Sequence, residues 1–532
     1  MLESINTHSR SLWSVYLLGL IINLSGLHAG EVEEILAKED RARVPEFPQD
    51  LAWINTKDGK PLSIEDLKGK VVLLDFWTYG CINCMHVIPD LKKLERKYEK
   101  ELVVIGVHSA KFDTEKGLEN IRNAALRYGL IHPVLNDNHQ DVWKAYGIHS
   151  WPTLVVLDPT GRPVGAVSGE GNYDVLDDVI GKVIKHFDPK KGIDREKVIG
   201  QPEKILGTNL LYPTKVAAQP AGDGHPARIF ISDTNRHRIL VATPEGQVTD
   251  IIGNGTHGNK DGSYTEAKFD MPRGLVAYQN SLFIADTENN SIRKVDLEKK
   301  TVETIAGTGE QKWSRKGGLA VNTPLNSPWD VEISPDGKSL YIAMAGNHAI
   351  WLMNLENKTV DLFAGTPKEA LVDGEFLEAA FAQPSGLALS GDKLYSADAE
   401  SSSVRELNLK TGKVSTLVGT GLFDFADQDG PGKEALLQHV LAVRVYGEKL
   451  LIADTYNHKI KQIDLTNHNK VETFLGTGQP GKDDGEKPSF YEPSGLAILN
   501  DTLFIADTNN HLIRVVDLKT KKVSTLKLDM PK

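Results

Sequence analysis

The sequence predicts two domains of different class in series, an α/β domain followed by an all-β propeller of six blades. An apolar run at 71–77 that turns into a helical pattern indicates the first domain, with Cys81 and Cys84 at the turn. A string that recurs every 53 to 58 residues in the second half indicates the propeller. The length of 532 residues also exceeds that of one ordinary domain.

The turn between strand and helix carries the only two cysteines of the chain, so they have no other partner within it. We expect Cys81 at the helix N-terminus, where free N–H groups and the helix dipole stabilise a thiolate. Cys84, one turn on, is placed to close a short ring and release a mixed disulfide. A structural zinc site needs four ligands and usually a second Cys or His pair, so we expect neither a metal nor a cofactor. The spacing predicts a redox-active disulfide.

The surroundings of these cysteines resemble the thioredoxin superfamily. Asp75 lies six residues before Cys81, Pro89 eight after it, and Trp151–Pro152 is followed by threonine, as in the cis-proline loop of that family. The resemblance implies that Asp75 handles the proton of Cys84 and that Pro152 contacts the substrate backbone. Further substrate contacts are expected at Gly80, Ile82, Asn83 and Trp151.

Residues 46–187 are the expected extent of this thioredoxin-like domain. A small hairpin before residue 71 and a helical insertion at 116–128 resemble the TlpA/ResA-type branch of exported thioredoxins. Residues 30–45 are charged and are expected to be a tether or to hold a short helix, and residues 188–205 are expected to be a linker.

Residues 1–29 are typical of a secretory signal, with Arg10 before an apolar core at 13–22 and Leu27-His28-Ala29 as the cleavage site. The core is shorter than the roughly 20 residues that span a bilayer, so membrane contact is expected only through this transient segment. We therefore expect an exported protein, periplasmic or extracellular. The net charge of −11, without a basic stripe, argues against a nucleic-acid partner.

Residues 206–532 contain six units of four expected strands each, an arrangement typical of a β-propeller. Strings such as Asp454-Thr-Tyr-Asn-His resemble NHL repeats. Because an Asp recurs in nearly every unit, we interpret it as a structural turn residue rather than a catalytic or metal-binding one. The equivalent positions are Asp233, Asp286, Met344, Asp398, Asp454 and Asp507.

The combination of both domains resembles the NHL-repeat-containing protein 2 family, whose active-site string is close to Trp77–His86. We expect an exported thiol–disulfide oxidoreductase that acts on a protein thiol or disulfide, depends on a redox partner, and uses the propeller as a protein-binding platform. Two alternatives stay open. Thr78, three residues before Cys81, partially matches the peroxiredoxin T-x-x-C motif, so one alternative is a thiol peroxidase of redoxin type. The other is a non-catalytic propeller scaffold.

Overall fold

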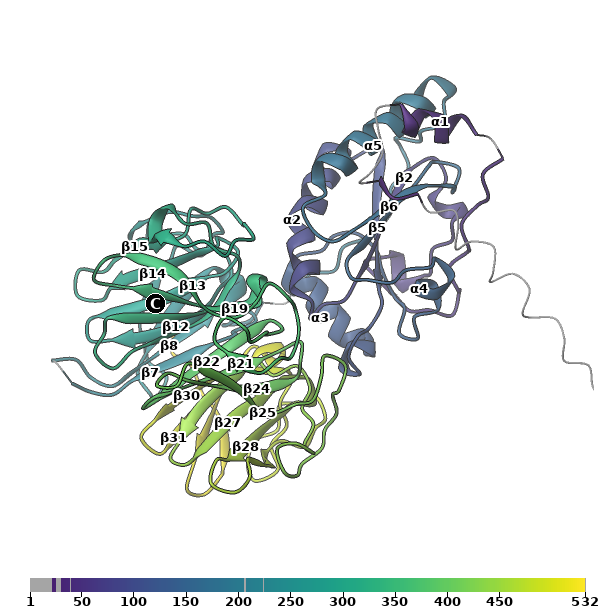
Figure 1. The fold of residues 1–532 in the computed structure, drawn as a ribbon. Helices are drawn as coiled ribbons and strands as arrows, with labels where there is room; N and C mark the ends of the chain where they lie inside the picture. The colour runs from purple at the N-terminus through teal and green to yellow at the C-terminus, as the bar shows by residue number, and fades with distance from the viewer. Residues whose placement is uncertain (1–21, 25–29, 39, 205–206, 223, 532) are drawn as a thin grey trace, which may run out of the picture. The chain divides into compact units, whose positions relative to one another are not determined.

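The computed structural model describes residues 22–24, 30–38, 40–204, 207–222 and 224–531. The chain divides into two compact units, residues 1–206 and 207–532 (Figure 1). Among the described residues, no helix is both long enough and apolar enough to cross a membrane.

The first unit is built on one six-stranded sheet with the order β1-β4-β3-β2-β5-β6. Its centre is β2, which pairs in parallel with β3 and antiparallel with β5. Every residue of β2 and β3 is buried, as expected for strands covered on both faces. The strands are β1 (Trp53–Ile54), β2 (Val71–Trp77), β3 (Leu102–His108), β4 (Val134–Asn136), β5 (Thr153–Leu157) and β6 (Pro163–Ser168).

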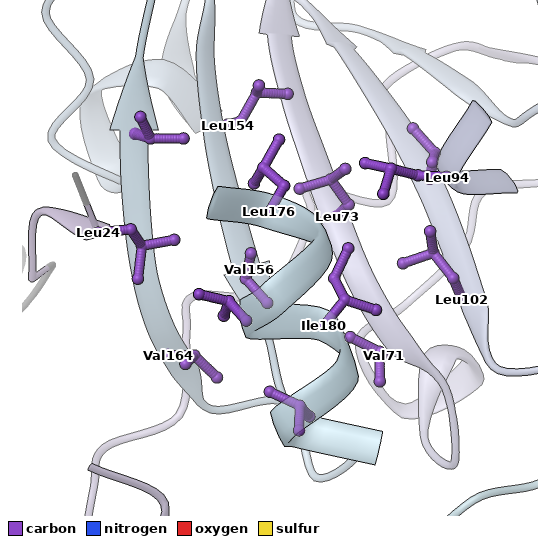
Figure 2. Packing of buried hydrophobic residues seen from close by; sticks show 14 of the residues in the cluster. Leu24, Val71, Leu73, Leu94, Leu102, Leu154, Val156, Val164, Leu176 and Ile180 are labelled. Atoms are coloured by element: carbon purple, nitrogen blue, oxygen red, sulfur yellow. The ribbon is translucent and has the colours of Figure 1, made fainter. Parts of the chain in front are cut away.

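Helices cover both faces of this sheet. One face packs against α2 (Ile82–Lys97), α5 (Tyr173–Phe187) and α1 (Glu31–Ala37), with Leu73, Leu94 and Ile180 among the buried residues (Figure 2). The other face packs against α4 (Asp141–Ala145). The remaining helix, α3 (Leu118–Tyr128), lies within the predicted insertion. The α/β thioredoxin-like prediction is confirmed by this architecture.

The segments on either side of the expected thioredoxin-like domain both pack against the first unit. Helix α1 forms within 30–45, and its Val32 and Leu36 are buried in the core beside α5 because they fall on one helical face. Within 188–205, the backbone N–H groups of Asp194 and Gln201 donate to the carbonyl oxygens of Gly69 and Asn55. The described part of this segment is therefore fixed to the first unit.

Most of the predicted signal segment lies outside the described residues, but 22–24 do not. Asn23 bridges Ala166 in parallel, the Ala166 N–H donates to the Ile22 carbonyl at 2.8 Å, and Leu24 is buried. A Cβ on Gly165 would lie 2.3 Å from Leu24, so a glycine is needed for this close approach. Signal cleavage stays a prediction, and it would remove a packed segment.

The second unit has six sheets of four main strands each, which confirms the six-bladed propeller. The first of the four main strands of each blade is innermost. Neighbouring inner strands contact one another around the full ring. The inner strands are β7 (Val216–Gln219), β12 (Pro272–Tyr278), β17 (Pro328–Ile333), β22 (Pro384–Ser390), β26 (Ala442–Tyr446) and β30 (Pro493–Leu499).

Three further strands complete each blade, moving outward. These are β8 (Arg228–Asp233), β9 (Arg238–Ala242) and β10 (Val248–Ile252); β13 (Ser281–Asp286), β14 (Ser291–Asp296) and β15 (Thr301–Ala306); β18 (Ser339–Met344), β19 (Ala349–Asn354) and β20 (Thr359–Ala364); β23 (Lys393–Asp398), β24 (Ser403–Asn408) and β25 (Lys413–Val418); β27 (Lys449–Asp454), β28 (Lys459–Asp464) and β29 (Lys470–Leu475); β31 (Thr502–Asp507), β32 (Leu512–Asp517) and β33 (Val523–Thr525). Short fifth strands border three blades: β11 (Gly262–Ser263), β16 (Gly318–Leu319) and β21 (Gly374–Glu375).

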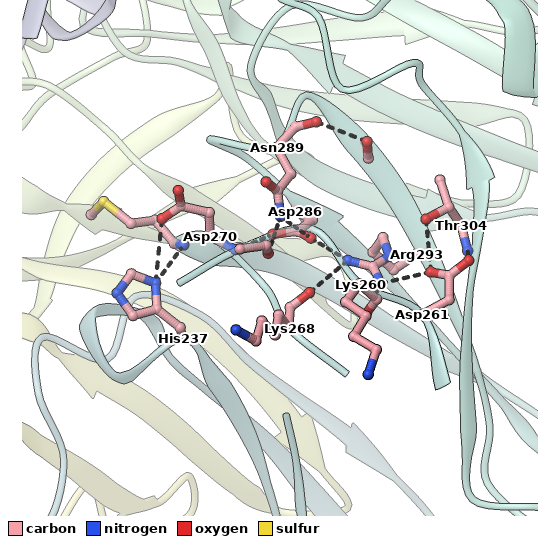
Figure 3. A network of polar contacts seen from close by, with 12 residues as sticks. His237, Lys260, Asp261, Lys268, Asp270, Asp286, Asn289, Arg293 and Thr304 are labelled. Carbon is pink, nitrogen blue, oxygen red and sulfur yellow. Dashed lines mark hydrogen bonds and ion pairs between the residues drawn. The ribbon is translucent and has the colours of Figure 1, made fainter. Parts of the chain in front are cut away.

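The recurring Asp closes five of the six blades internally. In the second blade, Asp286 accepts a hydrogen bond from the Asp270 N–H and an ion pair from the buried Arg293, which also binds Asp261 (Figure 3). Met344 replaces the Asp in the third blade, and its sulfur lies 3.4 Å from the Asn326 N–H. These contacts support a structural role for the recurring position.

The Thr and His of the repeat join neighbouring blades. The Thr455 hydroxyl donates to the Pro493 carbonyl at 2.8 Å, and His458 Nδ1 accepts from the Glu492 N–H at 3.2 Å. Thr508 and His511 make the same two bonds to Pro213 and Tyr212, which closes the ring between the last blade and the first. The repeated string is therefore explained by assembly of the propeller.

Candidate active site

The two cysteines lie where β2 passes into α2, and both are free thiols. Cys81 is the N-cap of α2 and is partly exposed, whereas Cys84 is 1% exposed. The Cys84 N–H donates to the Cys81 carbonyl at 3.1 Å, which fixes the two residues in one turn. The partly exposed thiol can meet a large partner, and the buried one can meet only Cys81.

A buried carboxyl lies below Cys84. Asp75 is 3% exposed, and burial raises its pKa to about 7, against an opposing effect of charge on His132. Burial also raises the pKa of Cys84 well above its usual value, and the hydrogen bond with Cys81 and the charges of Cys81 and Asp75 act in the same direction. A thiol that holds its proton needs a base beside it before it can act as a nucleophile, and Asp75 is the near carboxylate.

His132 and Glu95 continue this group of buried polar residues. His132, before β4, is buried, and its Nδ1 lies 3.1 Å from Glu95 Oε1 on α2. Within the described residues, His132 Nε2 and Asp75 Oδ1 are buried without a hydrogen-bond partner. Sequence reasoning did not identify His132, because 57 residues separate it from Asp75 and only the sheet brings them together.

The loop before Cys81 is held by a second buried acid, Glu115, which sequence reasoning also missed. Its carboxylate accepts from the Thr78 hydroxyl at 2.5 Å and from the Gly80 N–H at 3.1 Å. It also accepts from the backbone N–H groups of Lys111 and Phe112 at 2.8 and 2.9 Å. Charge-assisted bonds of this kind fix the loop, and the bond to Thr78 supports a structural role for that hydroxyl.

The Trp151–Pro152 peptide bond is cis, as the sequence predicts. Thr153 lies opposite Phe76 in the antiparallel pairing of β5 with β2, so Pro152 is at the end of the sheet where the cysteine loop begins. Trp151 Nε1 donates to the Ser109 carbonyl at 2.9 Å, and its ring lies 4.4 Å from that of Trp143. Both contacts fix the proline loop beside the cysteines.

The expected substrate contacts divide by exposure. Gly80 and Ile82 are buried, and the Gly80 N–H donates to Glu115. Asn83 and Trp151 are partly exposed and can meet a substrate side chain. Substrate contact at these four residues stays a prediction.

His86, on the first turns of α2, is buried and forms an ion pair with Glu170, which follows β6. Within the described residues, no group of three His, Cys, Asp or Glu side chains is placed to hold a metal ion. His86 is thus tied to a carboxylate, and the site consists of two thiols above buried acids.

Comparison with known proteins identifies the family. A model described as thioredoxin-like matches residues 69–163, and one described as NHL repeat matches residues 490–516. NHL repeat-containing protein 2 of Homo sapiens is 41% identical over 529 residues, covering 92% of this chain and 72% of that protein. The chain belongs to the NHL repeat-containing protein 2 family.

Two further relatives match this chain over different lengths. Protein SUPPRESSOR OF QUENCHING 1, chloroplastic, of Arabidopsis thaliana is 42% identical over 524 residues; the match covers 93% of this chain but only 49% of that protein, about half its length. Thiol-disulfide oxidoreductase ResA of Bacillus thuringiensis is 31% identical over 126 residues, covering 24% of this chain and 70% of ResA. The thioredoxin-like domain thus has thiol–disulfide oxidoreductases among its relatives.

Proposed function

We propose that this protein is a thiol–disulfide oxidoreductase that acts on protein disulfides through Cys81 and Cys84. The observation that carries the proposal is the pairing of a partly exposed Cys81 at the start of α2 with a buried Cys84 one turn away, above the buried Asp75. A cysteine pair with one accessible and one enclosed thiol suits a two-step exchange.

The exchange proceeds in two displacements when the substrate is reduced. The Cys81 thiolate attacks one sulfur of the substrate disulfide and releases the other as a thiolate, which leaves a mixed disulfide. Asp75 then takes the proton of Cys84, and the Cys84 thiolate attacks the Cys81 sulfur and releases the second substrate thiol. Two electrons have passed to the substrate, Cys81–Cys84 is now a disulfide, and a dithiol redox partner restores it. The same steps in reverse oxidise a substrate.

Reduction of insulin disulfides by the pre-reduced full chain tests this proposal. Cys81→Ser should abolish turnover, whereas Cys84→Ser should give one stable mixed disulfide per molecule, because no second thiol releases it. Exposed Asp58→Asn is the matched control and should not change the rate. Turnover that survives Cys81→Ser would refute the assignment, and peroxide consumption without insulin reduction would favour the peroxidase alternative.

We further propose export through residues 1–29 and recruitment of the protein substrate by the propeller. A tethered binding surface raises the effective concentration of substrate at Cys81 without changing the thiol chemistry. Export is tested by N-terminal sequencing of protein from its native host, where a start at Gly30 is expected and a start at Met1 contradicts it. Recruitment is tested by capturing substrates with Cys84→Ser and asking whether they also bind the propeller.

A further inference from the structure

The ring of six inner strands in the propeller surrounds a cavity of about 250 Å³. Every inner strand contributes to its lining, so the cavity lies on the axis of the ring. Of the residues that line it, Glu332 on β17 and Arg444 on β26 carry charges, and the others are alanine, valine, leucine and isoleucine, although the surface open to the cavity is more polar than apolar. Burying charges costs free energy even when they are paired, so these two residues call for an explanation.

Both charges depart from the repeat. Glu332 stands four residues after Pro328, and Arg444 stands four residues after Val440, at the same position of two inner strands. The other four blades close the same ring with small or aliphatic residues at this position, so assembly of the propeller does not require a charge there. The equivalents are Ala217, Val276, Ala388 and Ala497.

A second pair of opposite charges, Lys215 and Asp330, lies two residues earlier on the inner strands. Its hydrogen-bonding groups are occupied by partners within the propeller. Lys215 Nζ donates to the carbonyl oxygens of Ser385 and Leu441 at 2.7 and 2.6 Å and lies 3.3 Å from Asp330 Oδ2. These partners belong to three other blades, so Lys215 spans the ring and closes it at that level. Both side chains are almost fully buried, which leaves this pair no capacity for a ligand.

Glu332 and Arg444, by contrast, keep hydrogen-bonding capacity. Arg444 Nη1 bonds the carbonyl oxygens of Leu387 and Val443, and within the described residues its hydrogen bonds all come from that nitrogen. Glu332 Oε2 lies 3.8 Å from Arg444 Nη1, so the two side chains form an ion pair with each other but no hydrogen bond. The two side chains are 19% and 18% exposed while lining the cavity, so a carboxylate and part of a guanidinium remain available there.

We propose that this axial cavity binds a small zwitterion, the class of the α-amino acids. The free edge of the Arg444 guanidinium pairs with the ligand carboxylate, and Glu332 accepts from the ligand ammonium. The rest of the lining, which includes Leu275, Val445 and Ile498, surrounds the body of the ligand. The volume is below the range of roughly 300–1,000 Å³ of sites for drug-sized molecules, which suits a ligand the size of one amino acid.

The ionisation of Glu332 gives the proposed site a characteristic pH dependence. Burial raises the pKa of Glu332 to about 7; the charge of Arg444 opposes the rise and that of Asp330, which also lies beside Lys215, adds to it. A ligand ammonium interacts with the ionised carboxylate, so affinity is full above pH 7 and falls about tenfold for each pH unit below it. A carboxylate ligand without an ammonium would gain nothing from ionised Glu332 and would not weaken as the pH falls.

Calorimetric titration of the full chain with L-leucine at pH 8 and pH 6 tests the proposal. Isovalerate, which lacks the ammonium, and isoamylamine, which lacks the carboxylate, are the comparison ligands. We expect one L-leucine site, about tenfold weaker at pH 6, and roughly 10- to 100-fold weaker binding after Glu332→Gln or Arg444→Gln. Glu332→Gln should also remove the pH dependence. Lys338→Gln, which breaks an exposed ion pair with Glu356 elsewhere on the propeller, is the control and should bind normally.

Several outcomes would overturn the proposal. These are no binding of L-leucine at millimolar concentration, binding of isovalerate or isoamylamine as tight as that of L-leucine, or unchanged L-leucine binding in both variants. If Arg444→Gln unfolds the propeller, the near-isosteric Glu332→Gln and the pH profile of the unmodified chain still decide the result. The proposal is independent of the thiol chemistry, because none of its residues lies in the first unit.

Discussion

Replacing Asp75 by Asn should stabilise the first unit in a strongly pH-dependent manner. Burial raises the pKa of Asp75 to about 7 in the folded protein, from the usual 3.8. Below pH 3.8 the group is protonated in both folded and unfolded states and has no effect on stability. As the pH rises from 3.8 to 7, the unfolded state releases the proton and the folded state retains it, so the free energy of unfolding falls.

The size of the effect follows from the two pKa values. Their difference corresponds to roughly 4 kcal/mol at pH 8, and to about 1 kcal/mol at pH 4.5. Asn also needs hydrogen-bond partners in the buried position, which shifts both values by a constant cost of about 1–3 kcal/mol. The firm prediction is therefore the change between the two pH values, about 3 kcal/mol in favour of Asp75→Asn at the higher pH.

Urea unfolding of the full chain, with pulsed hydrogen exchange and mass spectrometry of peptides from β2, measures this quantity in the first unit alone. Asp58→Asn changes an exposed acid in the same unit and should show no such dependence. An Asp75→Asn effect that is equal at pH 4.5 and pH 8 would refute the raised pKa. It would also remove Asp75 as a base for Cys84 near neutral pH.

Three further predictions concern other buried groups. His132→Gln removes the charge that opposes the rise in the pKa of Asp75, so the pH profile for release of the mixed disulfide should move to higher pH; an unmoved profile contradicts this coupling. Glu115→Gln keeps the shape of the side chain but loses the charge that holds the Gly80 loop, so the free energy of unfolding should fall by about 2 kcal/mol in urea melts. An unchanged free energy of unfolding would contradict this role of Glu115. His458→Ala leaves the buried Glu492 N–H of the next blade without its acceptor, so calorimetry should show the propeller destabilised by about 1–3 kcal/mol. An unchanged unfolding transition of the propeller would show that this hydrogen bond is dispensable.

The sequence alone was enough for the fold class and for the cysteine pair. Burial on both faces of β2 and β3 follows from continuous apolar runs, and the propeller follows from six repeated units of four expected strands each. Local spacing also placed Cys81 and Cys84 one turn apart at the start of α2, and the resemblance to thioredoxins implied the cis bond at Pro152. These features depend on residues close together in the chain, or on patterns repeated along it.

Tertiary structure alone decided which distant side chains share a site. Glu115 reaches Thr78 across 37 residues because the loop after β3 folds over the cysteine loop, and no local pattern marks that acid among 72 Asp and Glu. The exposure of single residues was equally hidden from the sequence, since Ile82 is buried although it lies between the two cysteines. In the propeller, Glu332 and Arg444 meet only because the inner strands form a closed ring. The energy of a buried charge depends on what surrounds it in space, and that is set by the packed fold rather than by neighbours in sequence.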